Sequence, residues 1–135
     1  MKIDPYLHFS GNCADAIALY EKAFNTKVSH MMKYGDTPAE VSYPPQPGTE
    51  NFIGHATLPV GETDLMLCDV PPDMENIIGN NVSLHVTLDS IDSVKAAFDI
   101  LKDGGEVGME LQKTFWSECF GSLTDKFGIG WMFSV

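Results

Sequence analysis

The stretch Val82–Ser90, VSLHVTLDS, indicates how this chain is organised. Apolar residues at the even positions from 82 to 88 alternate with Ser83, His85 and Thr87. Such alternation predicts a strand with one buried face and one polar face. Ser90 is a good helix N-cap, so a helix is expected to begin directly after it. The stretch therefore predicts a half-buried strand that leads straight into a helix.

The same plan occurs earlier in the chain. Leu7–Ser10, LHFS, resembles Leu84–Thr87, LHVT, and His85 follows His8 by 77 positions. The same spacing joins two pairs of apolar positions in the predicted helices: Ile17 with Val94, and Phe24 with Leu101. The periodicity of these apolar positions predicts one buried face on each helix. The chain is therefore expected to contain two copies of one structural unit.

Each copy is expected to contain a strand, a helix and three further strands. In the first copy we expect strands within 6–10, 27–35, 51–60 and 63–70, with Asn12 as the N-cap of a helix ending near Asn25. In the second copy we expect strands within 82–90, 106–115, 119–128 and 129–135, with a helix ending near Leu101. The predicted fold class is α+β, with two βαβββ modules that form half-barrel mixed sheets. Residues 1–135 would form a single domain of two repeats, about 1–70 and 82–135, joined by a connector at 71–81.

Two further segments carry predictions of their own. The last residues, Trp131–Val135, are expected to form a buried strand that completes the second module. Asp36–Glu50 contains four prolines, which cannot donate to a strand ladder, so it is expected to be a loop. A loop of this length is either a rim over a site or a simple excursion, and the sequence does not decide between these alternatives.

Composition excludes several classes of partner. The formal net charge is −11, with 19 acidic residues against 8 Lys and Arg, so nucleic acid and anionic membranes are not expected as partners. No segment has the long apolar run that a spanning helix or a secretory leader requires, which favours a cytoplasmic location. Cys13, Cys68 and Cys119 are widely spaced and form no CxxC motif, so they are interpreted as buried apolar residues.

Several segments together resemble one protein family. They are PYLHFSGNCADAIALYEKAF, GHATLPV, LMLCD and, most specifically, TFWSECFGSLTDKFGIGWMF. They resemble the PhnB-like subgroup of the vicinal oxygen chelate superfamily, which includes glyoxalase I, extradiol dioxygenases and bleomycin- and fosfomycin-resistance proteins. The name demethylubiquinone methyltransferase is also used in this subgroup. The chain lacks the strand–GxGxG–helix unit that such a methyltransferase normally needs, so that activity is not expected.

The resemblance also implies where a metal would be held. In metal-bearing relatives, the first and last strands of each module usually supply His, Gln or Glu ligands. The corresponding positions here hold Pro5, Met132 and the Leu65–Cys68 run, while His8 and His85 are displaced along their strands. The chain is therefore expected to bind no metal or other cofactor tightly. If a metal were bound, the first candidates would be His8 and His85, followed by Cys68 and Asp69.

Five residues are predicted to form a site for a small organic molecule in the cup of the half-barrel. They are His8, His55, His85, Trp116 and Glu118. Imidazoles can bond to a ligand or move protons, and Trp commonly forms the wall of a pocket. The alternative for each His is a structural role, which is the interpretation given to His30, and Trp116 could equally be a core residue.

Three functions remain open at this point. The first is binding of a small organic molecule by a homodimer. The second is catalysis by a metal-dependent lyase, isomerase or dioxygenase of the vicinal oxygen chelate type. The third is a regulatory or interaction protein with no chemistry of its own. The missing carboxylate ligands favour the first.

Overall fold

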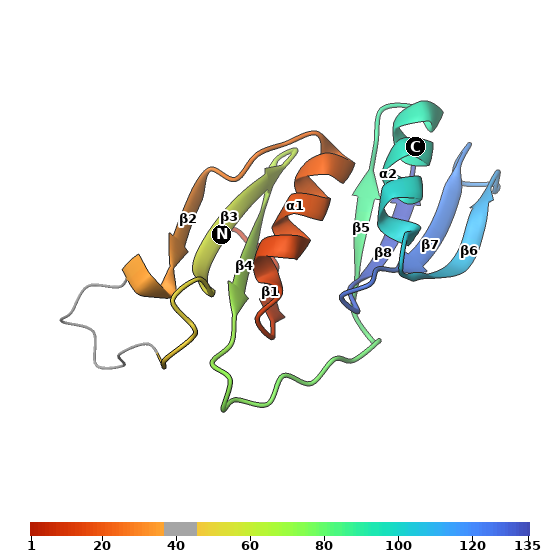
Figure 1. Cartoon of the computed structure of the whole chain (residues 1–135). Coiled ribbons are helices and arrows are strands. Elements are labelled where there is room, and N and C mark those ends of the chain that lie inside the picture. Colours follow the sequence, from red (N-terminus) through yellow and green to blue (C-terminus); the bar gives the residue numbers. More distant parts are fainter. Residues whose placement is uncertain (37–45) are drawn as a thin grey trace. The chain divides into compact units, whose positions relative to one another are not determined.

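The computed structural model describes residues 1–36 and 46–135 (Figure 1). The chain divides into two compact units, Met1–Asn76 and Ile77–Val135. Part of the proline-rich segment, residues 37–45, lies outside the described residues, so the choice between a rim and an excursion stays open. Whether the two units form one domain also stays a prediction.

The first unit follows the predicted βαβββ order. Its elements are β1 (Tyr6–Phe9), α1 (Cys13–Phe24), β2 (His30–Lys33), the 3₁₀ turn η1 (Tyr34–Asp36), β3 (Ile53–Val60) and β4 (Thr63–Asp69). The strands form one sheet in the order β1-β4-β3-β2. β1 is parallel to β4, whereas β3 is antiparallel to both of its neighbours. The sheet is therefore mixed, as predicted.

The second unit repeats this topology. Its elements are β5 (Ser83–Thr87), α2 (Ile91–Lys102), β6 (Glu106–Gln112), β7 (Phe120–Thr124) and β8 (Gly130–Ser134). The sheet order is β5-β8-β7-β6, again with the first strand parallel to the last. His8 pairs with Cys68 on β4, and its repeat mate His85 pairs with Met132 on β8. The two predicted βαβββ modules are confirmed.

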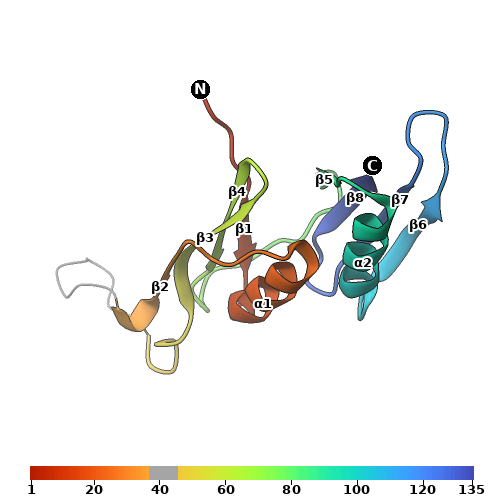
Figure 2. The ribbon, with the colours of Figure 1, turned by 90° about the horizontal axis from the view of Figure 1, so that it is seen from above.

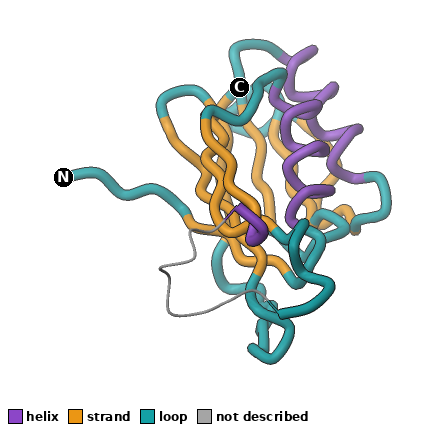
Figure 3. The backbone as a smooth tube through the Cα atoms, turned by 60° about the vertical axis from the view of Figure 1, so that its left-hand side comes forward, coloured by secondary structure: helices purple, strands orange, loops and turns teal. Residues whose placement is uncertain are grey.

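In each unit the helix lies against one side of its sheet (Figures 2 and 3). The repeat mates Ile17 and Val94 are both buried on the sheet-facing sides of α1 and α2. On the sheets, alternate residues such as Leu65 and Leu67 of β4 are buried in the same layer. The opposite side of each sheet carries the residues between them, and we call this side the open face.

The last strand is an interior strand of its sheet. β8 pairs with β5 on one side and with β7 on the other. Trp131 and Phe133 are 2% and 0% exposed, and the indole nitrogen of Trp131 donates to the buried carboxylate of Asp125 at 2.9 Å. The prediction of a buried C-terminal strand is therefore confirmed.

The two helices begin in different ways. The hydroxyl of Ser90 accepts a hydrogen bond from the backbone N–H of Ser93, as expected for an N-cap. Asn12 occupies the N-cap position of α1, as predicted, but its side chain forms no capping hydrogen bond. The predicted capping interaction was therefore wrong. The carboxylate of Asp69 instead accepts from the N–H groups of Gly11 and Cys13, at 2.8 and 3.0 Å. A residue at the end of β4 thus stabilises the start of α1.

Within the described residues, neither helix has the length and apolar character needed to cross a lipid bilayer.

Candidate functional site

The open face of the first sheet carries two rows of side chains. One row runs across all four strands, because β1 pairs with β4, β4 with β3, and β3 with β2 in matching register; it contains Tyr6, Met66, Thr57 and His30. The second row lies on the same face, two residues away from the first on each strand, and contains His8, Cys68, His55 and Met32. Three of the four histidines of the chain therefore lie on one face of one sheet.

The aromatic rings of these rows are in contact. The Tyr6 and His8 rings stack with centroids 5.1 Å apart and an interplanar angle of 20°. The His55 ring lies 5.7 Å from that of Tyr6 and 5.9 Å from that of His30. Tyr6 is 44% exposed, and His8 and His30 are exposed as well. The face is therefore an ordered aromatic surface that remains open to contact.

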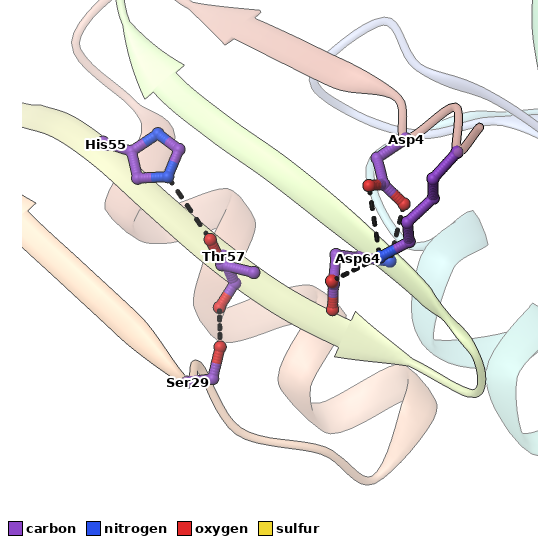
Figure 4. A network of polar contacts seen from close by, with 6 residues as sticks. Asp4, Ser29, His55, Thr57 and Asp64 are labelled. Atoms are coloured by element: carbon purple, nitrogen blue, oxygen red, sulfur yellow. Dashed lines mark hydrogen bonds and ion pairs between the residues drawn. The ribbon is translucent and has the colours of Figure 1, made fainter.

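Hydrogen bonds fix His55 at the centre of this surface. Its Nδ1 lies 2.8 Å from the hydroxyl of Tyr6, and its Nε2 lies 3.3 Å from Oγ1 of Thr57. Figure 4 shows His55 and Thr57 along β3, with the hydroxyl of Ser29 donating to the backbone carbonyl of Thr57. One imidazole nitrogen has a partner on β1 and the other has a partner on β3 itself, so the ring has a defined orientation.

The Tyr6 hydroxyl also interacts with the thiol of Cys68. Partial burial, followed by the nearby thiol, raises the pKa of Tyr6 to about 12. Burial also raises the pKa of Cys68, while the hydrogen bond from Tyr6 acts in the opposite direction because it stabilises the thiolate. Tyr6 therefore stays protonated near neutral pH, and its hydroxyl interacts with two groups, Nδ1 of His55 and the thiol of Cys68.

The charged residues of this face lie at its edge. Asp64 is two residues before Met66 on β4, and its carboxylate is 2.8 Å from Nζ of Lys2. Lys2 also pairs with Asp4 at 3.2 Å (Figure 4). This ion-pair network satisfies the carboxylates locally and leaves the centre of the face to imidazole, phenol and sulfur groups.

The open face of the second sheet has a smaller polar group. Nε2 of His85 lies 2.9 Å from Oγ of Ser134, whose hydroxyl is also 3.3 Å from Oγ1 of Thr87. Met132 pairs with His85 across β5 and β8. This face therefore presents one oriented imidazole beside hydroxyl groups, in contrast with the three imidazoles of the first sheet.

Trp116 and Glu118 lie away from the strands, in the connection from β6 to β7. Trp116 packs edge-on against Phe120 at 5.3 Å and against Phe115 at 4.6 Å, and remains 55% exposed. Glu118 is exposed between the buried residues Ser117 and Cys119. The alternative that Trp116 is a core residue is wrong, because more than half of its surface is exposed.

The donor groups of each unit do not fit a divalent metal site. Within the part of the chain that the structure describes, neither unit brings together three or more His, Cys, Asp or Glu side chains that could hold an ion. On β8 the residues that share the open face with His85 are Met132 and Ser134, neither of which is a carboxylate. A metal of this fold family needs three or four such ligands, so no chemical step is assigned to one here.

Three residues that were not predicted as site residues contact His8 or His55. Tyr6 and Thr57 were not singled out in the sequence, and His30 was interpreted as structural. Alternation along β1 and β3 does indicate that Tyr6 and Thr57 share the faces of His8 and His55. The contact between His30 and His55 depends on the β2–β3 register, which no local pattern specifies.

Comparison with known proteins defines the family. The chain belongs to the Glyoxalase/Bleomycin resistance protein/Dioxygenase superfamily, whose family model matches residues 2–133. The resemblance to the vicinal oxygen chelate superfamily is therefore confirmed over nearly the whole chain.

Individual relatives agree with this assignment. Protein YjdN of Escherichia coli (strain K12) is 34% identical over 143 residues, covering 100% of this chain and 95% of the relative. The crystal structure of protein PA1353 from Pseudomonas aeruginosa is 34% identical, with a TM-score of 0.85, and the match covers 99% of this chain and 96% of that one.

More distant structures share the fold. A Bacillus cereus protein, described as a putative 3-demethylubiquinone-9 3-methyltransferase, PhnB protein, has a TM-score of 0.80 at 24% identity, over 99% of this chain and 98% of that one. The fosfomycin resistance protein FosX from Listeria monocytogenes, whose structure contains Mn(II) and sulfate, has a TM-score of 0.61 at 9% identity, over 98% of this chain and 89% of that one. The PhnB-like likeness thus extends to the fold as well as to the quoted sequence segments.

Proposed function

We propose that this protein binds a small organic molecule on the open face of its first sheet. His8 and His55 are the ligand-binding residues predicted there, and Tyr6, His30 and Cys68 join them. The open face around His85 is the corresponding candidate surface of the second unit. Trp116 and Glu118 remain candidates in the loop beside that sheet.

The observation that carries this proposal is the hydrogen-bonded group around His55. Tyr6, His55 and Thr57 are linked by contacts of 2.8 and 3.3 Å, yet all three side chains remain at least partly exposed. Polar side chains that are already oriented and still reach the surface can hydrogen-bond to an incoming molecule and fix its orientation. Side chains that are already oriented lose little conformational entropy when a ligand binds, which favours affinity.

The kinds of side-chain groups on the open face favour binding over metal-dependent catalysis. The open face of the first sheet offers imidazoles, a phenol, a thiol and two thioethers, and the carboxylates near it are paired with Lys2. Methionine side chains adapt to apolar ligands of different shapes, and Met32 and Met66 are half-buried on the same face as the rings.

The proposal includes a homodimer in the cytoplasm with no nucleic-acid or membrane partner. Several apolar side chains of the second unit are strongly exposed in the single chain, including Phe115 at 98% and Ile77 at 80%. Exposed apolar groups of this size favour burial against another protein surface. The net charge of −11 is unfavourable for contact with phosphate backbones or anionic lipids.

The experiment is a ligand screen read by methionine methyl NMR. The protein is labelled with ¹³C at the methionine methyl groups and titrated with a library of small organic compounds. Met32 and Met66 lie on the open face of the first sheet, so their signals should move with true ligands, while those of Met109 and Met132 report on the second unit.

A variant and a matched control complete the test. His55→Ala should weaken a confirmed hit by about tenfold or more, because one ordered polar contact is lost and the Tyr6 hydroxyl is released. Lys33→Gln is the matched control. Lys33 is on β2 but pairs with the core residue Ile53, so its replacement should leave the affinity for the ligand unchanged. Hits that move neither Met32 nor Met66, or that bind equally to the His55→Ala protein, would overturn the proposal.

A further inference from the structure

We propose that the ligand of the first sheet is a small aromatic carboxylic acid, bound through its ring to Tyr6 and His8 and through its carboxylate to the imidazoles. This inference rests on the proposed function and specifies its ligand class. It follows from which polar atoms of the open face already have partners and which do not.

The first step concerns the imidazole nitrogens. His55 has partners at both ring nitrogens. Among the described residues, the ring nitrogens of His8 and His30 form no hydrogen bond, and both side chains are exposed. Each therefore offers a donor to an incoming group. When protonated, an imidazole donates from both nitrogens and carries a positive charge, which favours an anionic acceptor.

The second step concerns the other charges that face these rings. On β1 the titratable groups are Tyr6 and His8, on β2 His30, on β3 His55, and on β4 Cys68 and Asp64. Asp64 is held by Lys2 at 2.8 Å, at the hairpin end of the face. Tyr6 keeps its proton, as its raised pKa of about 12 requires. The centre of the face thus presents two imidazoles whose ring nitrogens have no hydrogen-bond partner among the described residues, His8 and His30, while the carboxylate on β4, Asp64, is already paired.

The third step concerns shape. The flat stack of Tyr6 and His8, at an interplanar angle of 20°, offers ring faces and edges to a planar partner. Met32 and Met66 add polarizable apolar surface beside the rings. A planar aromatic body matches this surface better than a sugar or a flexible chain would.

The fourth step concerns the chain as a whole. Its net charge of −11 repels anions at long range, so nonspecific attraction does not explain acid binding. Affinity for a carboxylate must come from local contacts to imidazole. Because a protonated imidazole binds a carboxylate more tightly than a neutral one, affinity should be higher at lower pH.

The test compares 2-naphthoate with its neutral isostere 2-naphthamide, at pH 5.5 and at pH 8.0, by methionine methyl NMR and calorimetry. The acid stays ionised at both pH values, so only the protein changes charge. We expect 2-naphthoate to bind about tenfold more tightly at pH 5.5, because a charge-assisted hydrogen bond replaces a neutral one. The affinity of 2-naphthamide should change by less than about twofold.

Variants distinguish the contribution of His8 and His30 to binding from any effect on folding. His8→Gln and His30→Gln keep a neutral donor and should each reduce the pH dependence for 2-naphthoate. Lys33→Gln removes a cation from β2 outside the open face and should leave the pH dependence of 2-naphthoate binding unchanged. Circular dichroism at both pH values establishes that every protein compared is folded.

Two failures are distinguishable. If 2-naphthamide binds the first sheet as tightly as 2-naphthoate at both pH values, the acid preference is wrong while the proposed function stands. If library compounds bind but none moves Met32 or Met66, the proposed function itself is wrong, and the ligand class falls with it.

Discussion

Replacement of Asp69 by Asn should destabilise the first unit strongly, although the two side chains have nearly the same shape. Asp69 is 3% exposed and ends β4. Its Oδ1 accepts from Gly11 and Cys13 at 2.8 and 3.0 Å, and its Oδ2 accepts from the backbone N–H of Ile53 at 2.8 Å. One carboxylate therefore joins the start of α1, the start of β3 and the end of β4.

The magnitude follows from these three contacts. Asn can keep two of them through its single oxygen, but its NH₂ group would face the N–H of Ile53, leaving a buried donor without an acceptor. Losing a hydrogen bond to a charged group costs about 1.5–3 kcal/mol, and the two retained bonds weaken when the acceptor becomes neutral. Relief of the buried charge offsets part of this loss. We expect a net decrease of about 3 kcal/mol in the free energy of unfolding.

The assay is urea unfolding followed by circular dichroism, with amide hydrogen exchange to identify the unit affected. Asp64→Asn is the matched control on the same strand, because the carboxylate of Asp64 is partly exposed and pairs with the exposed Lys2. Exposed pairs contribute about 0–1 kcal/mol. The amides of Gly11, Cys13 and Ile53 should exchange faster in Asp69→Asn only. If both variants lose less than about 1 kcal/mol, the reasoning is refuted.

Three further predictions concern the site and the assembly. Tyr6→Phe should slow alkylation of Cys68 by iodoacetamide near pH 8, because loss of the hydroxyl raises the pKa of Cys68 further and lowers its thiolate fraction; an unchanged rate, measured by mass spectrometry, would contradict the Tyr6–Cys68 contact. Sedimentation at micromolar concentration should detect a homodimer, and Phe115→Asp should shift it toward monomer if that exposed ring is buried in the interface; a monomeric wild-type protein would refute the dimer. Elemental analysis after dialysis should find well below one equivalent of zinc, nickel or iron per chain, and near one equivalent would restore the metal-dependent alternative.

The fold was predictable because its signals are local and repeated. Alternation in Val82–Leu88 and the apolar helix positions around Ile17 and Val94 each reflect burial of one face. The repeat then gave the order of elements twice. The N-cap of α1 was not predictable in this way, because the acceptor comes from Asp69, which is 56 residues beyond Cys13 in the chain.

The site was predictable only in part, for a related reason. The sequence indicated that His8 and His55 are functional candidates, since both lie in strands with a polar side. It did not indicate that Tyr6 bonds to His55 or that His30 lies beside it, because these contacts depend on the pairing of separate strands. A local pattern predicts the face on which a residue lies, whereas the register decides its neighbours.

The most direct test of the account is a crystal structure of the protein with the tightest compound from the ligand screen. The account predicts that the compound contacts at least two of Tyr6, His8 and His55 within about 4 Å, on the side of the first sheet opposite α1. A compound bound elsewhere, with these three side chains unchanged and solvated, would contradict it.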